Sequence, residues 1–135
     1  MAVTCSTHLE ASTCSFLIER RSPRLVYVRI EGHDVGELGE LPMRCIEAFL
    51  PPASLADLFI DARGTRGATI DVSNAWSSWL ARNRQRFAAI HMRAGSRYVH
   101  FTADFVRRFS ELEQLMQLHA SDEGFDAALA ASMPG

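Results

Sequence analysis

The sequence predicts an α/β fold built on a small, mixed and largely parallel sheet. Short apolar runs that are typical of strands alternate with longer segments whose apolar residues recur every three or four positions, as on one face of a helix. Such alternation favours neighbouring parallel strands joined by right-handed crossovers. The expected order of elements is ββαβαβαβα.

The first predicted unit is a β-hairpin. Residues 16–18 and 25–30 are rich in apolar and β-branched side chains, and Pro23 between them fits a turn. The preceding residues 1–15 are small and polar, so we expect a variable lead-in without an assigned element. A single α/β domain is predicted over 16–135.

A helix and a central strand follow the hairpin. Pro42 suits the first turn of a helix, where its missing N–H needs no partner, and the two prolines at 51–52 end that helix. We therefore expect a helix over 42–50. The unbroken apolar run 58–60 indicates a strand that is covered on both faces.

The clearest element is an amphipathic helix that begins at Asp71, whose carboxylate is expected to cap it. Its stripe consists of Val72, Ala75, Trp76, Trp79, Leu80, Asn83 and Phe87. Trp76 and Trp79 are expected to pack in the core. The alternative is that both form walls of a ligand pocket.

The C-terminal part adds strands over 89–92 and 115–119, and helices over 96–113 and from 122 onward. Ser121 is expected at the start of the last helix. The helix over 96–113 has an apolar stripe of Tyr98, Phe101, Phe105, Phe109 and Leu112. A charged face with His100, Asp104, Arg107 and Arg108 lies opposite this stripe, and we expect that face to be solvated rather than catalytic.

Composition excludes several classes of protein. The formal net charge of −2 supplies no positive field for nucleic acid. No signal peptide is visible and no apolar run suits a membrane span, so a cytoplasmic protein is expected. We also expect the protein to be bacterial. Cys5, Cys14 and Cys45 lack metal-ligand spacing, which predicts free thiols, no metal and no cofactor.

A resemblance rests on three features: the segment Asp-Leu-Phe-Ile-Asp-Ala-Arg-Gly-Thr-Arg-Gly at 57–67, the tryptophan-bearing helix after Asp71, and Phe-Asp-Ala-Ala-Leu at 125–129. With these the chain resembles the sporulation-antagonist (SpoIIAA-like) branch of STAS domains over about 16–129. The resemblance implies a small α/β sandwich. It also implies a non-enzymatic role in regulation or in binding lipids or other apolar ligands.

The resemblance also implies a modification site. STAS antagonists of anti-sigma factors have a phosphorylatable serine in an Asp-Ser-Ser-Gly motif at a helix N-terminus. Asp71 and Ser73 match that motif, whereas Val72 and Asn74 depart from it. Ser73 is thus a candidate phosphorylation site, and the alternative is an unmodified serine in the first turn.

The segment after residue 60 is the second candidate site, because ligands of open α/β sheets bind beyond the carboxyl ends of strands. Asp61, Arg63, Arg66 and Asp71 would form an anion- or ligand-binding loop before a helix N-terminus. The alternative is a glycine-containing turn with solvated arginines.

Two functions remain open. The first is a regulatory or protein-interaction module with a protein partner, and the second is a carrier or sensor of an apolar or phosphorylated small ligand. An enzyme is not expected, because it would require a constellation such as His91, Asp61 and Ser73 at one place. The sequence does not fix the oligomeric state.

Overall fold

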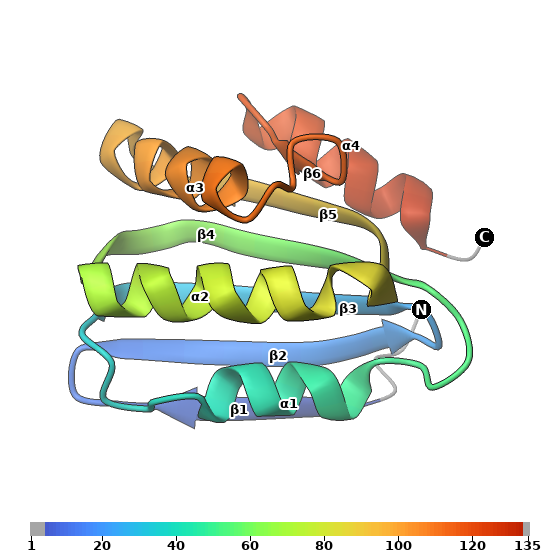
Figure 1. Ribbon diagram of the computed structural model, residues 1–135, viewed down its shortest axis with the longest axis horizontal. Helices are drawn as coiled ribbons and strands as arrows, with labels where there is room; N and C mark the ends of the chain where they lie inside the picture. Colours follow the sequence, from blue (N-terminus) through green and yellow to red (C-terminus); the bar gives the residue numbers. More distant parts are fainter. Residues whose placement is uncertain (1–4, 134–135) are drawn as a thin grey trace.

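The computed structural model describes residues 5–133, in which six strands form one sheet with four α-helices around it (Figure 1). The elements follow one another as β1 (Cys5–Glu10), β2 (Cys14–Ser22), β3 (Leu25–Asp34), α1 (Leu41–Phe49), β4 (Ala56–Ala68), α2 (Ile70–Asn83), the 3-10 turn η1 (Arg84–Arg86), β5 (Phe87–Ala94), α3 (Arg97–Phe109), β6 (Met116–Leu118) and α4 (Asp122–Ser132).

The sheet is mixed, as predicted. Its strands lie in sequence order from β1 to β6, with antiparallel pairing from β1 to β3 and parallel pairing from β3 to β6. The predicted order of elements lacks only β1, because no element was assigned to residues 1–15. Residues 1–4 lie outside the described part, whereas Cys5–Glu10 pairs along its whole length with β2.

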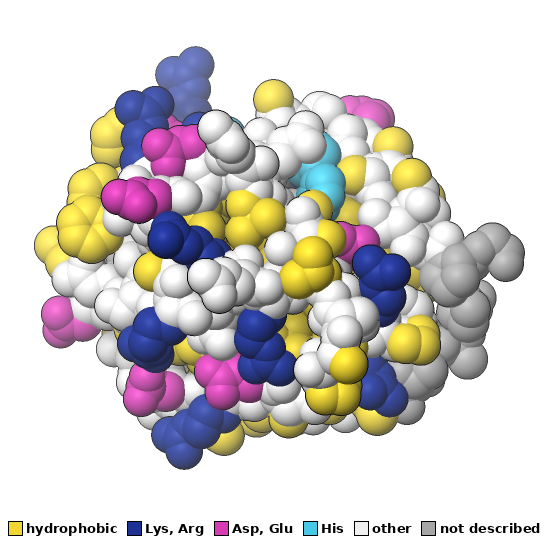
Figure 2. Space-filling model, turned by 45° about the vertical axis from the view of Figure 1, so that its right-hand side comes forward, with side chains coloured by type: hydrophobic (Ala, Val, Ile, Leu, Met, Phe, Trp, Pro, Cys, Tyr) yellow, Lys and Arg dark blue, Asp and Glu magenta, His cyan; other side chains and the backbone are white. Residues whose placement is uncertain are grey.

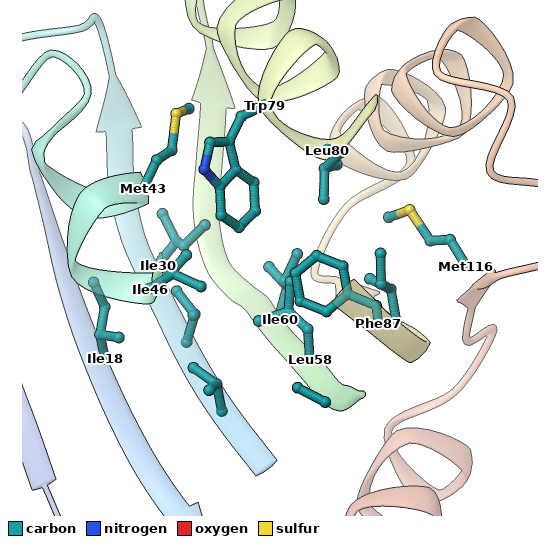
Figure 3. Close-up of a cluster of buried hydrophobic side chains, with 14 of the residues drawn as sticks. Ile18, Ile30, Met43, Ile46, Leu58, Ile60, Trp79, Leu80, Phe87 and Met116 are labelled. Atoms are coloured by element: carbon teal, nitrogen blue, oxygen red, sulfur yellow. The ribbon is translucent and has the colours of Figure 1, made fainter. Parts of the chain in front are cut away.

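Two apolar layers hold the helices on opposite faces of the sheet. Residues of α1, α2 and α3 pack on alternate strand residues such as Leu58 and Ile60, and Figure 3 shows Trp79 and Phe87 among them. The intervening Phe59 faces the other way and packs against Phe125 of α4. A helix that covers only one face of a sheet buries one stripe, which is why each helix here is amphipathic.

The helix N-termini correct one predicted cap and confirm another. The side chain of Thr69, and not that of Asp71, accepts a hydrogen bond from the backbone N–H of Val72 (3.2 Å), so the N-cap lies two residues earlier than predicted and α2 begins at Ile70. Ser121 caps α4 as expected, with its hydroxyl accepting from Gly124 (3.1 Å). Phe87, which was predicted on the helix stripe, instead begins β5.

Candidate functional site

Helix α3 turns its bulkiest apolar side chains toward solvent. Tyr98, Phe101, Phe105 and Phe109, here called the aromatic stripe, are 64%, 75%, 53% and 69% exposed. The rings of Phe105 and Phe109 stack with their centroids 5.8 Å apart. The helix itself was predicted, but of the five residues in the expected stripe only Leu112, beyond the helix end, is buried.

The buried side of α3 consists of small residues instead. Val99, Ala103 and Val106 face the sheet. At 100° per residue these three lie about 120° around the helix from the aromatic stripe. The apolar arc of α3 is therefore wider than its contact with the sheet, and the aromatic half of that arc is more than half exposed.

A cavity of about 90 Å³ lies where α2 and α3 cross the sheet. It exists because small side chains meet there, including Ala62 and Ala68 of β4 and Ala103 of α3. Its lining is almost entirely apolar, and Asp34 is the one charged residue in it among those the structure describes. The cavity thus suits a neutral apolar guest and offers no cation for a phosphate.

The two tryptophans have different positions. Trp76 is half-buried and forms part of the cavity wall. Trp79 is fully buried in the core, and its indole N–H donates a 2.7 Å hydrogen bond to Oε1 of Glu47 on α1. Trp79 therefore ties α2 to α1 and does not line the cavity.

Ser73 lies in the same cavity wall. It is the fourth residue of α2, and its backbone N–H already donates to the carbonyl oxygen of Thr69 (3.0 Å). Its side chain is half-buried between α2 and α3. A phosphate there would bring close to two negative charges into apolar surroundings, which would disturb the packing of the two helices.

The segment proposed as an anion-binding loop is a strand. Strand β4 extends to Ala68, with two register shifts in its pairing with β3, and Asp61 within it is buried. Its carboxylate accepts hydrogen bonds from the Tyr27 hydroxyl (2.7 Å) and from Nη2 of Arg63 (2.8 Å). Burial alone would raise the pKa of Asp61, but these hydrogen bonds outweigh it and the pKa is lowered.

Arg63 is engaged by helix α4 as well as by Asp61. Its guanidinium lies 3.2 Å from Asp126 and 3.9 Å from Asp122, and Arg93 makes a further 2.9 Å ion pair with Asp122. Arg66 and Asp71 are exposed and take no part in this network. The charges of Asp61 and Arg63 in the middle of β4 thus hold α4 on the sheet, a role that the loop interpretation did not anticipate.

A pair of histidines was not anticipated either. Nδ1 of His91 lies 2.9 Å from Nε2 of His119, and the His91 ring stacks on Phe59 at 4.4 Å. Burial lowers the pKa of both imidazoles, and the neighbouring His119 lowers that of His91 further. The alternation of side chains along β5 would have allowed His91 to be predicted on the face of the sheet that α4 covers. No spacing in the sequence, however, relates His91 to His119.

The fold does not bring together His91, Asp61 and Ser73, the constellation that an enzyme would have required. His91 and Asp61 point toward the α4 face of the sheet, with the neighbours just described. Ser73 lies on the opposite face, in the wall of the cavity under α3. A nucleophile on one face of a sheet cannot use a base on the other, so this constellation supports no catalytic step.

The following findings on metal-binding groups, cysteines and membrane spans concern residues 5–133. No group of three or more His, Cys, Asp or Glu side chains there is arranged to hold a metal ion. The three cysteines are free, and burial raises the pKa of Cys14 to about 11. None of the described helices combines the length and apolarity needed to cross a membrane.

Comparison with solved structures identifies the fold. An uncharacterised protein of the DUF3478 family with a SpoIIAA-like fold, from Shewanella loihica PV-4, is similar over 95% of this chain and 99% of its own, with a TM-score of 0.62 and 11% identity. The anti-sigma factor antagonist SpoIIAA in its unphosphorylated form is similar over 85% of this chain and 96% of its own, with a TM-score of 0.58 and 14% identity.

The chain thus has a SpoIIAA-like fold, as the resemblance to STAS domains implied. Neither a family model nor a curated protein matches its sequence. At such low identity the likeness concerns the fold, and function has to be argued from the site.

Proposed function

We propose that this chain is a non-enzymatic, regulatory protein-interaction module, and that it binds its partner protein through the aromatic stripe of α3. The observation behind this proposal is the exposure of the four aromatic side chains on one helix. Aromatic side chains present about 150–250 Å² each, so a stripe about two-thirds exposed offers roughly 400–650 Å² of apolar surface. Patches of that size on monomeric proteins are often functional.

The residue types favour a protein partner. Tyrosine, phenylalanine and arginine are enriched at protein interfaces, and rigid aromatic rings lose little conformational entropy on binding. Figure 2 shows one face of the molecule, on which apolar side chains reach the surface among charged ones. One of the two structures with a similar fold is an anti-sigma factor antagonist, which is consistent with a regulatory module.

The charged residues of α3 indicate which charges should surround the binding groove of the partner protein. Arg97, Arg107 and Arg108 outnumber Asp104, which pairs with both Arg107 (2.6 Å) and Arg108 (3.0 Å). The helix is thus basic in a chain whose formal net charge is −2. We expect the partner to surround an apolar groove with carboxylates, and we expect added salt to slow association.

The proposal is tested by affinity purification from the protein's own host with quantitative mass spectrometry. The variant Phe101→Ser/Phe105→Ser removes half of the stripe, and it should lose a protein that the unmodified chain retains. A matched control is Leu41→Ser/Leu55→Ser, which removes two exposed apolar side chains away from α3. Equal recovery of the same partners by both variants would remove α3 as the docking surface.

Regulation at Ser73 is the second part of the proposal. The cavity position of Ser73 supports a switch that acts by loosening α3 rather than by direct contact with the partner. Ser73→Asp should then weaken partner binding, whereas Ser73→Ala should leave it unchanged. If the partner is indifferent to Ser73→Asp, while the variant remains folded by circular dichroism, Ser73 is no switch.

A carrier of a small apolar ligand is the second candidate function, and the cavity between α2 and α3 favours it. The phosphorylated ligands considered with it gain no support, since Arg63 is bound to carboxylates. Titration with 1-hexanol should change the fluorescence of Trp76 in the cavity wall, and Trp76→Phe should abolish that change. An unchanged spectrum with hexanol and with longer alkanols would count against the carrier.

A further inference from the structure

Strand β1 is the outer strand of the sheet, at the border of the molecule where Figure 1 also shows α1. It pairs with β2 over all six residues without a register shift. One side of β1 therefore presents backbone N–H and C=O groups that no described strand satisfies.

The hairpin fixes which residues present these groups. The N–H of Ala11 donates to the carbonyl oxygen of Cys14 (2.9 Å) at the turn between β1 and β2. Since hydrogen-bonded and non-bonded pairs alternate in an antiparallel ladder, Leu9, Thr7 and Cys5 bond to β2. The backbone groups of the intervening residues, Ser6, His8 and Glu10, point away from the sheet.

Beta-sheet proteins protect such edges with lysine, proline, bulges or a covering segment. Strand β1 has no proline, no lysine or arginine and no bulge, and its ionisable side chains besides the thiol of Cys5 are His8 and, at its end, Glu10. Among residues 5–133 the edge is thus regular, and no described strand pairs with its outer side.

We propose that β1 pairs antiparallel with β1 of a second copy of this chain, with the two-fold axis at Thr7, so that the two sheets become continuous. This interface is separate from the aromatic stripe and goes beyond the proposed function. In this register Leu9 lies opposite Cys5 of the second copy, and His8 lies opposite Ser6. No like charges face each other among these pairs, and the Ser6–His8 pairs supply backbone hydrogen bonds in both directions.

The register centred on Thr7 is preferred over the neighbouring register centred on His8. Centring the axis on His8 would place the two His8 imidazoles directly opposite one another, where they repel when protonated. The register centred on Thr7 avoids this contact and pairs apolar Leu9 with Cys5 on the α1 face of the sheet.

Sedimentation velocity over a concentration series tests the interface. We expect the unmodified chain to form dimers as its concentration rises. His8→Pro removes the outward N–H of His8 from each copy without touching the β1–β2 ladder, and should weaken dimerisation about tenfold or more. His8→Ala, which keeps that N–H, should dimerise like the unmodified chain. If circular dichroism shows that His8→Pro is unfolded, Ser6→Pro replaces it.

Cross-linking tests the register. Thr7→Cys, in a Cys5→Ser/Cys45→Ser background, places two thiols at a non-hydrogen-bonded pair whose Cα atoms lie about 4.5 Å apart, within disulfide reach. Mild oxidation should give a covalent dimer from Thr7→Cys and little from His8→Cys. A chain that stays monomeric throughout, or a His8→Pro dimer of unchanged affinity, would overturn the interface, and the reverse cross-linking result would overturn the register.

Discussion

The imidazoles of His91 and His119 are hydrogen-bonded to each other, Nδ1 to Nε2 at 2.9 Å, between Phe59 of the sheet and Phe125 of α4. One ring must donate and the other accept, so at least one ring keeps an unprotonated nitrogen. Protonating both would place two cations at contact distance in a buried layer. The pair therefore stabilises the packing of α4 only while it is not doubly protonated.

A pH dependence of stability follows from this pair. The pKa of each imidazole is lowered in the fold, by burial first, and Asp57 offsets only part of this for His91. The unfolded chain therefore binds more protons, so the stabilisation is complete above about pH 6.5 and is lost as pH falls below that value toward the lower folded pKa.

Urea denaturation at pH 7.5 and pH 5.5 measures this effect, because carboxylates remain largely ionised between these values. The free energy of unfolding should fall at the lower pH, and His91→Gln/His119→Gln should flatten that fall. His33→Gln, which removes an exposed histidine, serves as the control and should keep the dependence. An equal fall in the double variant would contradict a role for the pair.

Tyr27 is predicted to stabilise the buried carboxylate of Asp61. Tyr27→Phe removes the 2.7 Å hydrogen bond while keeping the ring, and should cost about 1–3 kcal/mol of the free energy of unfolding. Burial, together with this hydrogen bond, raises the pKa of Tyr27 to about 12. Ultraviolet titration should therefore show a late-ionising tyrosine that Tyr27→Phe abolishes, and an unchanged titration curve would refute the assignment.

The link between α1 and α2 provides a third prediction. Trp79→Phe leaves a void and deprives Glu47 of its hydrogen-bond donor, so it should destabilise the fold by about 2–3 kcal/mol. Glu47→Gln keeps an oxygen that can accept the indole N–H and should cost less than about 1 kcal/mol. Thermal and urea denaturation compare the two, and equal costs would show that the hydrogen bond to Glu47 depends on its charge.

Gly95 is predicted to be required by a close approach of two backbones. A Cβ at this position would lie 2.2 Å from the carbonyl oxygen of Arg63, so Gly95→Ala must displace β4 or the start of α3. We expect a loss of about 1–3 kcal/mol. At Gly39, whose φ is +58° and whose Cβ would meet no atom within 4 Å, alanine adds backbone strain alone and should cost about 1 kcal/mol.

The sequence predicted most of the fold because its periodicities are local. The parallel strands, the helices and the cap at Ser121 depend on neighbouring residues and were found within a few positions. Strand β1 was missed because polar Ser6, His8 and Glu10 dominate it, which is expected of an edge strand but does not distinguish it from a loop.

The sites were harder to predict, because they depend on direction and on contacts distant in sequence. A spacing of three and four identifies α3 as a helix, yet the small residues Val99 and Ala103, and not Phe101, turned out to face the sheet. Likewise the composition of residues 61–68 suggested a loop, whereas these residues extend strand β4 beside β3, and Arg63 within it makes ion pairs to Asp122 and Asp126 on a later helix.

The most direct test of the central claim is photo-crosslinking in the native host with p-benzoylphenylalanine in place of Phe105. The exposed Ala88 of β5 is the control position. A docking surface on α3 predicts a covalent adduct with one protein from position 105 and not from position 88, lost when Phe101 is also changed to serine. Adducts with lipid alone, or the same protein adducts from both positions, would contradict it.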